Sequence, residues 1–222
     1  MELLEAIAQR HSVRAYTDQA ISGQTKEDLL ACIASCNQES GLHMQLILNE
    51  PQAFAGRMAR YGQFSGVRNY IALIGANTPD LAEKCGYFGE KVVLKAQQLG
   101  LNTCWVGLTY KKNADVLQIA ADEKLCLVIA IGYGQTPGTT HKIKQPSQVM
   151  QAAEPIPEWF QKGVAAALLA PTAVNQQKFT FTLKDNNKVS AKAGLGFYSK
   201  VDIGIAKLHF EIGAGLENFC WA

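Results

Sequence analysis

The sequence has no apolar run long enough to cross a lipid bilayer. Its longest apolar stretches, residues 125–131 and 164–170, fall far short of the ~20 residues that a membrane-spanning helix needs. Residues 1–10 also lack the basic start and the apolar run of a signal peptide. We therefore expect a cytoplasmic protein with no membrane partner.

The sequence also lacks an excess of charge of either sign. Its 21 Lys and Arg residues nearly balance 19 Asp and Glu residues, which leaves a net charge of +2. Such a balance gives no indication of a nucleic-acid or membrane surface. An anionic ligand would have to bind through a local cluster of basic side chains.

The six cysteines include no Cys-x-x-Cys pair, and the four histidines are scattered along the chain. Cys32 and Cys36 lie four residues apart in a helical stretch, and we interpret them as reduced packing residues rather than as redox or metal-binding residues. His209 and Glu211 are interpreted as packing or surface residues of the last helix. We expect no metal site.

The hydrophobic pattern predicts a layered α+β or α/β sandwich, because helices and strands alternate throughout a chain long enough to bury a full core. A loop is predicted over residues 134–147 and a proline-fixed hinge over residues 154–158. Gly100 stands where a helix C-cap is expected. Helices are predicted near residues 3–10, 25–36 (with Leu29, Leu30 and Ile33 on one face), 81–99, 114–120, 159–169 and 201–212, and strands near 42–48, 70–76, 103–107, 125–132 and 179–183.

One internal similarity suggests a duplicated unit. Residues 29–48 and 165–184 each read as a helix, a polar turn containing Asn-Gln, and an alternating strand. We predict a single unit over residues 1–222 with two pseudo-symmetric halves, residues 1–150 and 158–222, as if a homodimer had been fused into one chain. Chance similarity of short helix–turn–strand units is the competing interpretation.

The first candidate site segment contains Arg10, Ser12 and Arg14. These residues alternate, so in an extended segment two guanidiniums and a hydroxyl point to one side. Arginine donates paired, planar hydrogen bonds that suit a phosphate. A solvated basic turn after a helix is the alternative interpretation.

Two further segments have features typical of a ligand site. In residues 170–177, small residues and Pro171 allow the backbone to approach a flat ligand, and Thr172 and Asn175 can form hydrogen bonds with it. In residues 100–108, Gly107 follows a strand and frees backbone N–H groups to face a ligand. Taken alone, each also fits a plain turn or a buried strand with a flexible end.

Together, the three segments resemble a known family. Residues 10–16 (Arg-His-Ser-Val-Arg-Ala-Tyr) resemble the opening signature of the FMN-dependent nitroreductase family, residues 100–108 resemble its Gly-Leu-Gly-x-Cys-Trp-x-Gly stretch, and residues 170–177 resemble its Ala-Pro-Ser-x-x-Asn-x-Gln motif. In the common members the last motif lies much closer to the N-terminal arginines, where this chain has only a degenerate Ser-Cys-Asn-Gln at residues 35–38. That displacement, together with residues 86–90 and 201–211, is similar to the putative TM nitroreductase branch, and the resemblance covers nearly the whole chain.

The resemblance implies a nitroreductase-like fold that holds one FMN. The residues near the N-terminus would meet the phosphate and the ribityl chain, Arg14 would lie near N1 and O2 of the flavin, and the amides of residues 107 and 108 would lie beside N5 and O4. Lys142 and Lys144 stand where the family has a second basic pair, with lysine in place of the final arginine. The last motif would close the other side, which the partner subunit does in dimeric relatives. The implied FMN-binding residues are Arg10, His11, Ser12, Arg14, Val106, Gly107, Leu108, Lys142, Lys144, Pro171, Thr172 and Asn175.

The resemblance also implies an oxidoreductase that reduces small acceptors, such as nitroaromatics or quinones, with NADH or NADPH in a ping-pong scheme. Hydride transfer to a flavin needs no acid–base side chain, so no catalytic residue is assigned. Alternatives are another reaction on the same fold (dehalogenation, enoate reduction or flavin breakdown), an FMN carrier or sensor without turnover, and a scaffold that has lost its ligand. The chain is expected to be a monomer with fused halves or a homodimer.

Overall fold

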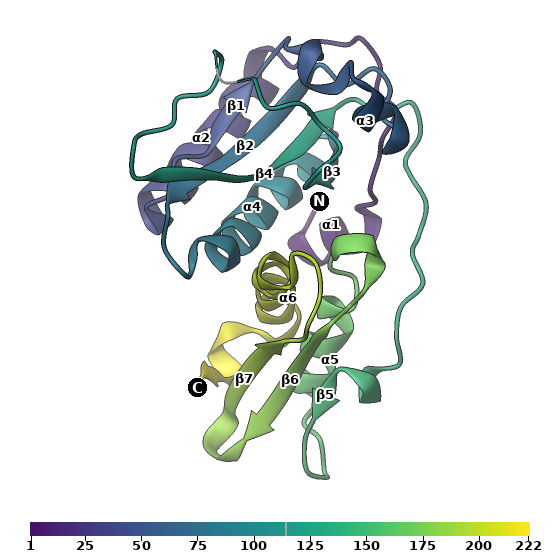
Figure 1. Ribbon diagram of the computed structural model, residues 1–222. Helices are drawn as coiled ribbons and strands as arrows, with labels where there is room; N and C mark the ends of the chain where they lie inside the picture. The colour runs from purple at the N-terminus through teal and green to yellow at the C-terminus, as the bar shows by residue number, and fades with distance from the viewer. Residues whose placement is uncertain (114) are drawn as a thin grey trace.

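Two four-stranded sheets lie at opposite ends of the molecule, with helices between them (Figure 1). The computed structural model describes residues 1–113 and 115–222. The first sheet is antiparallel and has the order β1 (Gln45–Ile47), β2 (Asn69–Ala76), β4 (Glu123–Gly132) and β3 (Asn102–Val106). The second sheet is mixed and has the order β5 (Met150–Gln151), β6 (Phe179–Lys184), β7 (Lys188–Ala193) and β8 (Cys220–Trp221).

Helices α4, α5 and α6 form the middle of the molecule (Figure 1). Helix α4 packs against the first sheet on one side and against α6 on the other, while α5 lies beside α6 and next to the second sheet (Figure 1). The sandwich therefore has the layers sheet, helix, helix and sheet. The helices are α1 (Leu3–Gln9), α2 (Gly23–Ser40), α3 (Arg57–Tyr61), α4 (Leu81–Gln98), α5 (Glu158–Ala167) and α6 (Ser199–Ala214), and short 3-10 turns occur at Pro51–Phe54, Pro146–Gln148, Ala173–Asn175, Asp185–Asn187 and Leu216–Asn218.

Strand β2 is apolar along nearly its whole length because both of its faces are buried. Ile71 and Leu73 point into the inner core toward α4, whereas Tyr70, Ala72 and Ile74 point into a second core on the outer face of the sheet. Successive side chains of a strand alternate between its faces, which accounts for this division. A sheet buried on both sides is a rigid support for the segments attached to its edge.

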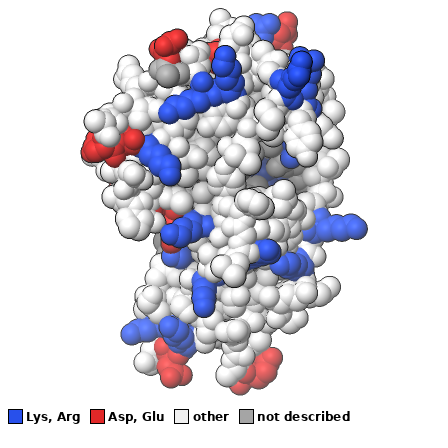
Figure 2. Space-filling view, in the orientation of Figure 1, with Lys and Arg blue, Asp and Glu red and all other residues white. Residues whose placement is uncertain are grey.

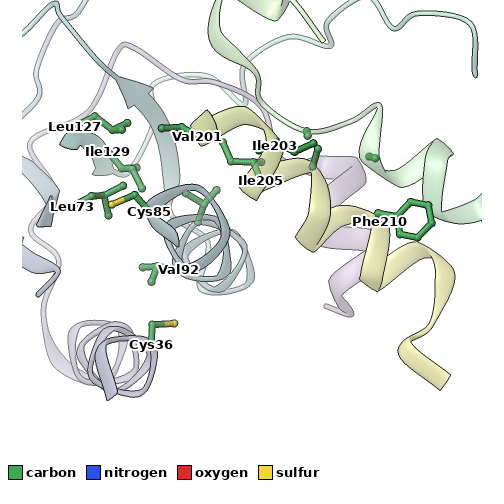
Figure 3. Close-up of a cluster of buried hydrophobic side chains, with 14 of the residues drawn as sticks. Cys36, Leu73, Cys85, Val92, Leu127, Ile129, Val201, Ile203, Ile205 and Phe210 are labelled. Atoms are coloured by element: carbon green, nitrogen blue, oxygen red, sulfur yellow. The ribbon is translucent and has the colours of Figure 1, made fainter. Parts of the chain in front are cut away.

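The inner core continues from the first sheet through α4 to α6. Figure 3 shows Leu73 of the sheet facing Cys85 and Val92 of α4, with Val201 and Phe210 along α6. All five side chains are at most 3% exposed. The two sheets therefore share one continuous core rather than forming separate domains.

The close crossing of α4 and α6 depends on glycine. A Cβ atom added at Gly86 would clash with the carbonyl oxygen of Val201, and one added at Gly204 would clash with the carbonyl oxygen of Glu83. The two helix backbones touch at these positions, where no side chain larger than hydrogen fits. This contact fixes the start of α6 relative to the first sheet.

The structure confirms the α+β fold class and most of the predicted elements, with some corrections. The C-cap of α4 is Leu99, and Gly100 follows it with φ +76°, the left-handed conformation that commonly occurs at the position after a C-cap. Leu30 is exposed, although Leu29 and Ile33 on the same helix are buried. The helix expected over residues 114–120 is wrong for the described residues 115–120, which form a turn followed by irregular backbone, and Ala114 lies outside the described residues. Helix α3 and strands β5, β7 and β8 were not anticipated.

The order helix, strand, strand, helix occurs twice along the chain, once with an interruption. In the second part it is formed by α5, β6, β7 and α6, whereas in the first part the series α2, β1, β2 and α4 is interrupted by helix α3, which lies between β1 and β2. The two elements of each predicted repeat, residues 29–48 and 165–184, correspond to α2 with β1 and to α5 with β6. The duplication itself, and the division into two halves, stay predictions.

Candidate functional site

A cavity of about 640 Å³ lies where the end of β3, the extended N-terminal segment and the start of α6 meet. It is lined by parts of the three segments predicted from the sequence: Ser12 and Arg14, residues 104–109 and residues 171–174. Residues 61–64, Leu127 and five residues at and after the entry to α6 complete the lining: Phe197, Tyr198, Val201, Asp202 and Ile205. The face seen in Figure 2 is hollowed, and Lys and Arg side chains surround the hollow while Asp and Glu side chains lie toward the margins.

The N-terminal segment reaches the cavity because it pairs with β3. Ser12 forms a parallel bridge with Thr103, and the Val13 N–H donates to the Thr103 carbonyl at 3.0 Å. Val13 is buried, so Ser12 and Arg14 point to the other side, where both line the cavity. The guanidinium carbon of Arg14 lies 6.0 Å from the Phe64 ring centroid. This arrangement leaves the charge of Arg14 at the cavity.

Arg10 does not line the cavity, although the alternation predicted that it would join Ser12 and Arg14. It is only 3% exposed, and its Nε lies 3.7 Å from Glu90 Oε1 without a hydrogen-bond partner. Burial lowers the pKa of Arg10, and the charge of Glu90 opposes that shift. Cys104 lines the cavity, and burial raises the pKa of its thiol while the nearby charges of Arg14 and Arg10 oppose that shift.

His11 lies against the loop that follows β4. A Cβ added at Gly138 would come within 2.7 Å of the His11 Cβ, which means that the loop backbone touches this side chain. Burial lowers the pKa of His11, and the charges of Arg10 and His141 lower it further. His11 is half-buried and does not line the cavity.

The end of β3 supplies Val106, Gly107 and Leu108 to the cavity wall, as predicted. The ring of Tyr198 lies against the backbone of Gly107, so that an added Cβ would come 2.5 Å from two ring carbons. Leu108 is 67% exposed and stands at the mouth of the cavity. Glycine is required here for close approach by an aromatic ring.

The late turn contributes Pro171 and Thr172 to the cavity, but not Asn175. The Asn175 amide donates to the Lys142 carbonyl at 2.8 Å, and the Gln177 amide donates to the same oxygen at 2.8 Å. Lys144 Nζ donates to the Gln177 carbonyl at 2.8 Å. Lys142, Lys144 and Asn175 are therefore brought together, but outside the cavity lining, where they tie the loop after β4 to the turn.

Sequence patterns gave no signal for several residues that line the cavity. Tyr198 has φ +54°, which is uncommon for a non-glycine residue, and directly precedes α6. Asp202 accepts from the Ala173 N–H at 2.9 Å and from the Gln176 amide at 2.7 Å, so it fastens the late turn to α6. Burial raises the pKa of Asp202 to about 6, against the effect of these hydrogen bonds. The exposed side chains at the mouth are mainly apolar or aromatic: Tyr61, Leu108, Val174 and Phe197.

Two other properties of the described residues bear on function. Residues 1–113 and 115–222 contain no cluster of three or more His, Cys, Asp or Glu side chains that could hold a metal ion. Within the same residues, no helix combines the length and the apolar character that crossing a membrane requires.

The sequence matches the family model described as "Putative TM nitroreductase" over residues 2–214. The chain belongs to this nitroreductase family. No curated protein matches it.

Solved structures of nitroreductases have a similar fold. A putative nitroreductase from Thermotoga maritima is 22% identical with a TM-score of 0.69, over 96% of this chain and 83% of that one. A putative nitroreductase in complex with FMN from Desulfovibrio desulfuricans is 20% identical with a TM-score of 0.55, over 71% and 99%. A putative NADH dehydrogenase/NAD(P)H nitroreductase from Bacteroides thetaiotaomicron is 15% identical with a TM-score of 0.53, over 66% and 95%.

Proposed function

We propose that the protein is an FMN-dependent oxidoreductase that passes electrons from NADH or NADPH to small acceptors such as nitroaromatics or quinones. The observation that carries this proposal is the meeting of three distant segments, at residues 12–14, 106–108 and 171–172, around one cavity. A volume of about 640 Å³ falls within the usual range for cofactor and ligand sites. Membership of the nitroreductase family and the FMN bound by the Desulfovibrio desulfuricans neighbour support it further.

The chemistry of the lining fits FMN. Arg14 offers a cation and Ser12 a hydroxyl on one side, Thr172 offers a hydroxyl on the other, and apolar side chains suit a flat ring. Behind the wall, the buried Arg10 Nε lacks a hydrogen-bond partner, as expected where an anion completes the site. We propose that Ser12, Arg14 and Thr172 bind FMN at the cavity, with Arg10 behind them. The lining residues Val106, Gly107, Leu108 and Pro171 complete the proposed FMN-binding residues.

Three basic or polar residues outside the lining remain proposed contacts for the phosphate side. Lys142 is exposed, and its carbonyl is held by the Asn175 and Gln177 amides. Lys144 is engaged with Gln177, so that it would act through the local positive charge rather than through a free ammonium group. His11 would act beside them, next to Arg10.

When bound, FMN supplies the hydride and electron transfer, while the protein supplies position and electrostatics. Arg14 brings positive charge to the cavity, which favours negative charge nearby. Gly107 lets the ring of Tyr198 pack against the end of β3 at the cavity wall, and the apolar and aromatic side chains at the mouth suit flat molecules. Donor and acceptor would occupy the same cavity in turn, which is the ping-pong scheme.

The test is an absorption spectrum of the purified protein after incubation with FMN and removal of free flavin. Anaerobic titration with NADH and then with NADPH follows, and the reduced protein is finally mixed with menadione or nitrobenzene. We expect a bound flavin spectrum, bleaching by at least one nicotinamide and recovery of the colour with the acceptor.

The outcomes separate the candidate functions. A protein that binds FMN and stays yellow with both nicotinamides would be a carrier or sensor, and the proposed electron transfer would be wrong. A protein that takes up no FMN would overturn the whole proposal and favour a scaffold.

A further inference from the structure

A buried carboxylate joins Arg10 to the cavity wall. Glu90 of α4 is fully buried, and its Oε2 accepts from the indole N–H of Trp105 at 2.9 Å. Its Oε1 lies 3.7 Å from Arg10 Nε and 2.9 Å from His209 Nε2. Trp105 lines the cavity, whereas Arg10, Glu90 and His209 lie behind it. The side chain of Glu90 thus contacts Arg10 and Trp105 at the site and His209 of α6.

The environment of His209 fixes the charge of this cluster. Its Nε2 faces Glu90 Oε1, and its Nδ1 faces the Ala166 carbonyl at 3.2 Å. A carbonyl oxygen only accepts, so Nδ1 carries a hydrogen, and the contact with Glu90 requires a second proton between the two side chains. Whether that proton sits on nitrogen or on oxygen, the His209–Glu90 pair is neutral as a whole.

The neutral pair leaves the charge of Arg10 uncompensated. Without His209, the carboxylate of Glu90 would balance the guanidinium at 3.7 Å, and the cluster would attract no anion. With His209, one full positive charge is buried, and Arg10 Nε has no hydrogen-bond partner. Buried charges are costly unless they are paired, so this charge favours an anionic partner from the adjacent cavity.

We infer that His209 and Glu90 are positioning residues for the phosphate group of FMN. Glu90 orients Arg10 and Trp105, and His209 neutralises Glu90 so that the charge of Arg10 remains available to the phosphate. The inference rests on the proposed function and gives His209 of the last helix a role behind the cavity wall. His209 is thereby more than the packing residue that its sequence position indicated.

The test compares the affinities for FMN and riboflavin, which share the ring and ribityl chain and differ by the phosphate. The dissociation constants of both are measured by flavin fluorescence for wild type, His209→Gln, His209→Lys and Arg10→Gln. His209→Gln should reduce the preference for FMN over riboflavin by about tenfold or more, as expected for loss of a charge-assisted contact. Arg10→Gln should reduce it at least as much, and His209→Lys, which retains a positive charge, should restore it.

His43→Gln is the matched control, because His43 is a partly exposed histidine paired with Glu123 and lies outside the cavity lining. It should keep the wild-type preference. An unchanged preference in His209→Gln, or an equal loss of affinity for both flavins, would overturn the inference and leave His209 as a structural residue. Arg10→Gln and the riboflavin measurement keep the test decisive if His209→Gln folds poorly. Failure of the wild type to bind either flavin would instead overturn the proposed function.

Discussion

Asp202 is a single residue on which both stability and the shape of the cavity depend. It is 2% exposed and joins the late turn to α6 through two hydrogen bonds. Because its pKa in the folded state is raised to about 6, the native state binds this proton more tightly than the unfolded chain does. The stability associated with the proton is fully present below the ordinary pKa of an aspartate and is lost as the pH rises through about 6.

We therefore predict that Asp202→Asn makes stability less dependent on pH between about 4 and 6, and stabilises the protein at neutral pH by up to about 3 kcal/mol. The amide oxygen of asparagine can still accept from the Ala173 N–H, but its amide nitrogen cannot accept from Gln176, so the gain is smaller than the full effect of the pKa shift. Thermal denaturation of both proteins across this pH range measures the effect. Asp185→Asn, at an exposed acid in the turn after β6, is the control. The same pH slope in wild type and Asp202→Asn would contradict the prediction.

Arg14 should tune the redox chemistry if FMN binds as proposed. Arg14→Ala removes the cation that lines the cavity, and we expect a lower two-electron potential and weaker retention of FMN, by about 1.5–3 kcal/mol for loss of a charge-assisted contact. Arg57→Ala removes an exposed arginine outside the lining and should change neither property. Spectroscopic titration against a reference dye measures the potential. Identical potentials in Arg14→Ala and wild type would remove Arg14 from this role.

At this scale the sequence predicted the cavity residues that depend on local alternation and missed those that depend on distant partners. Ser12 and Arg14 line the cavity because an extended segment alternates its side chains. Arg10 alternates in step with Ser12 and Arg14, but its side chain faces Glu90 of α4. Glu90 lies eighty residues later in the sequence, and no local pattern indicates such a contact. Asp202 and Tyr198 lie near the start of a helix whose apolar residues dominate its pattern.

Among the elements, the crossing of α4 and α6 tolerates the least change. Gly204→Ala would push a methyl group into the carbonyl oxygen of Glu83, and we expect a loss of about 1–3 kcal/mol, as for other overpacked sites. In a chain of this size such a loss lowers Tm by about 2–4 °C per kcal/mol. Differential scanning calorimetry measures it. Gly56→Ala is the control, because an added Cβ there meets no atom within 4 Å. Equal melting temperatures for the two variants would mean that the helices can move apart freely.

Elements with strong periodicity were predictable, and weakly apolar ones were not. Helix α4 and strand β2 combine long periodic patterns with clear ends, such as Gly100. Strand β7 contains only small or single apolar residues between lysines, so its alternation is faint. Its hairpin with β6 turns at Asn186 and Asn187, both with positive φ, and this pair of asparagines was the overlooked turn signal.

At the scale of the whole molecule, both walls of the cavity are formed by the same chain. Ser12 and Arg14 face the same space as residues 171–174 although more than 150 residues separate them in the sequence. Both of these parts of the cavity wall therefore come from one chain. Whether the chain is a monomer with fused halves or a homodimer stays a prediction.

We predict that one FMN binds per chain and that dilution does not weaken its binding. Size-exclusion chromatography with light scattering gives the mass, and flavin fluorescence at several protein concentrations gives the affinity. A site completed by a partner would instead lose FMN as the oligomer dissociates. Affinity that falls with protein concentration would thus contradict a cavity built by one chain.

The distance along the chain between the cavity walls has a consequence for biosynthesis. When synthesis has reached only the loop after β4, the chain contains the first wall of the cavity, with Ser12, Arg14 and residues 104–109. The turn at residues 171–174, which forms the opposite wall, has not yet been synthesised. Neither a shortened product nor a nascent fragment possesses a finished pocket. Uptake of the cofactor would then mark completed chains, and the energy of that uptake would protect them selectively from proteolysis.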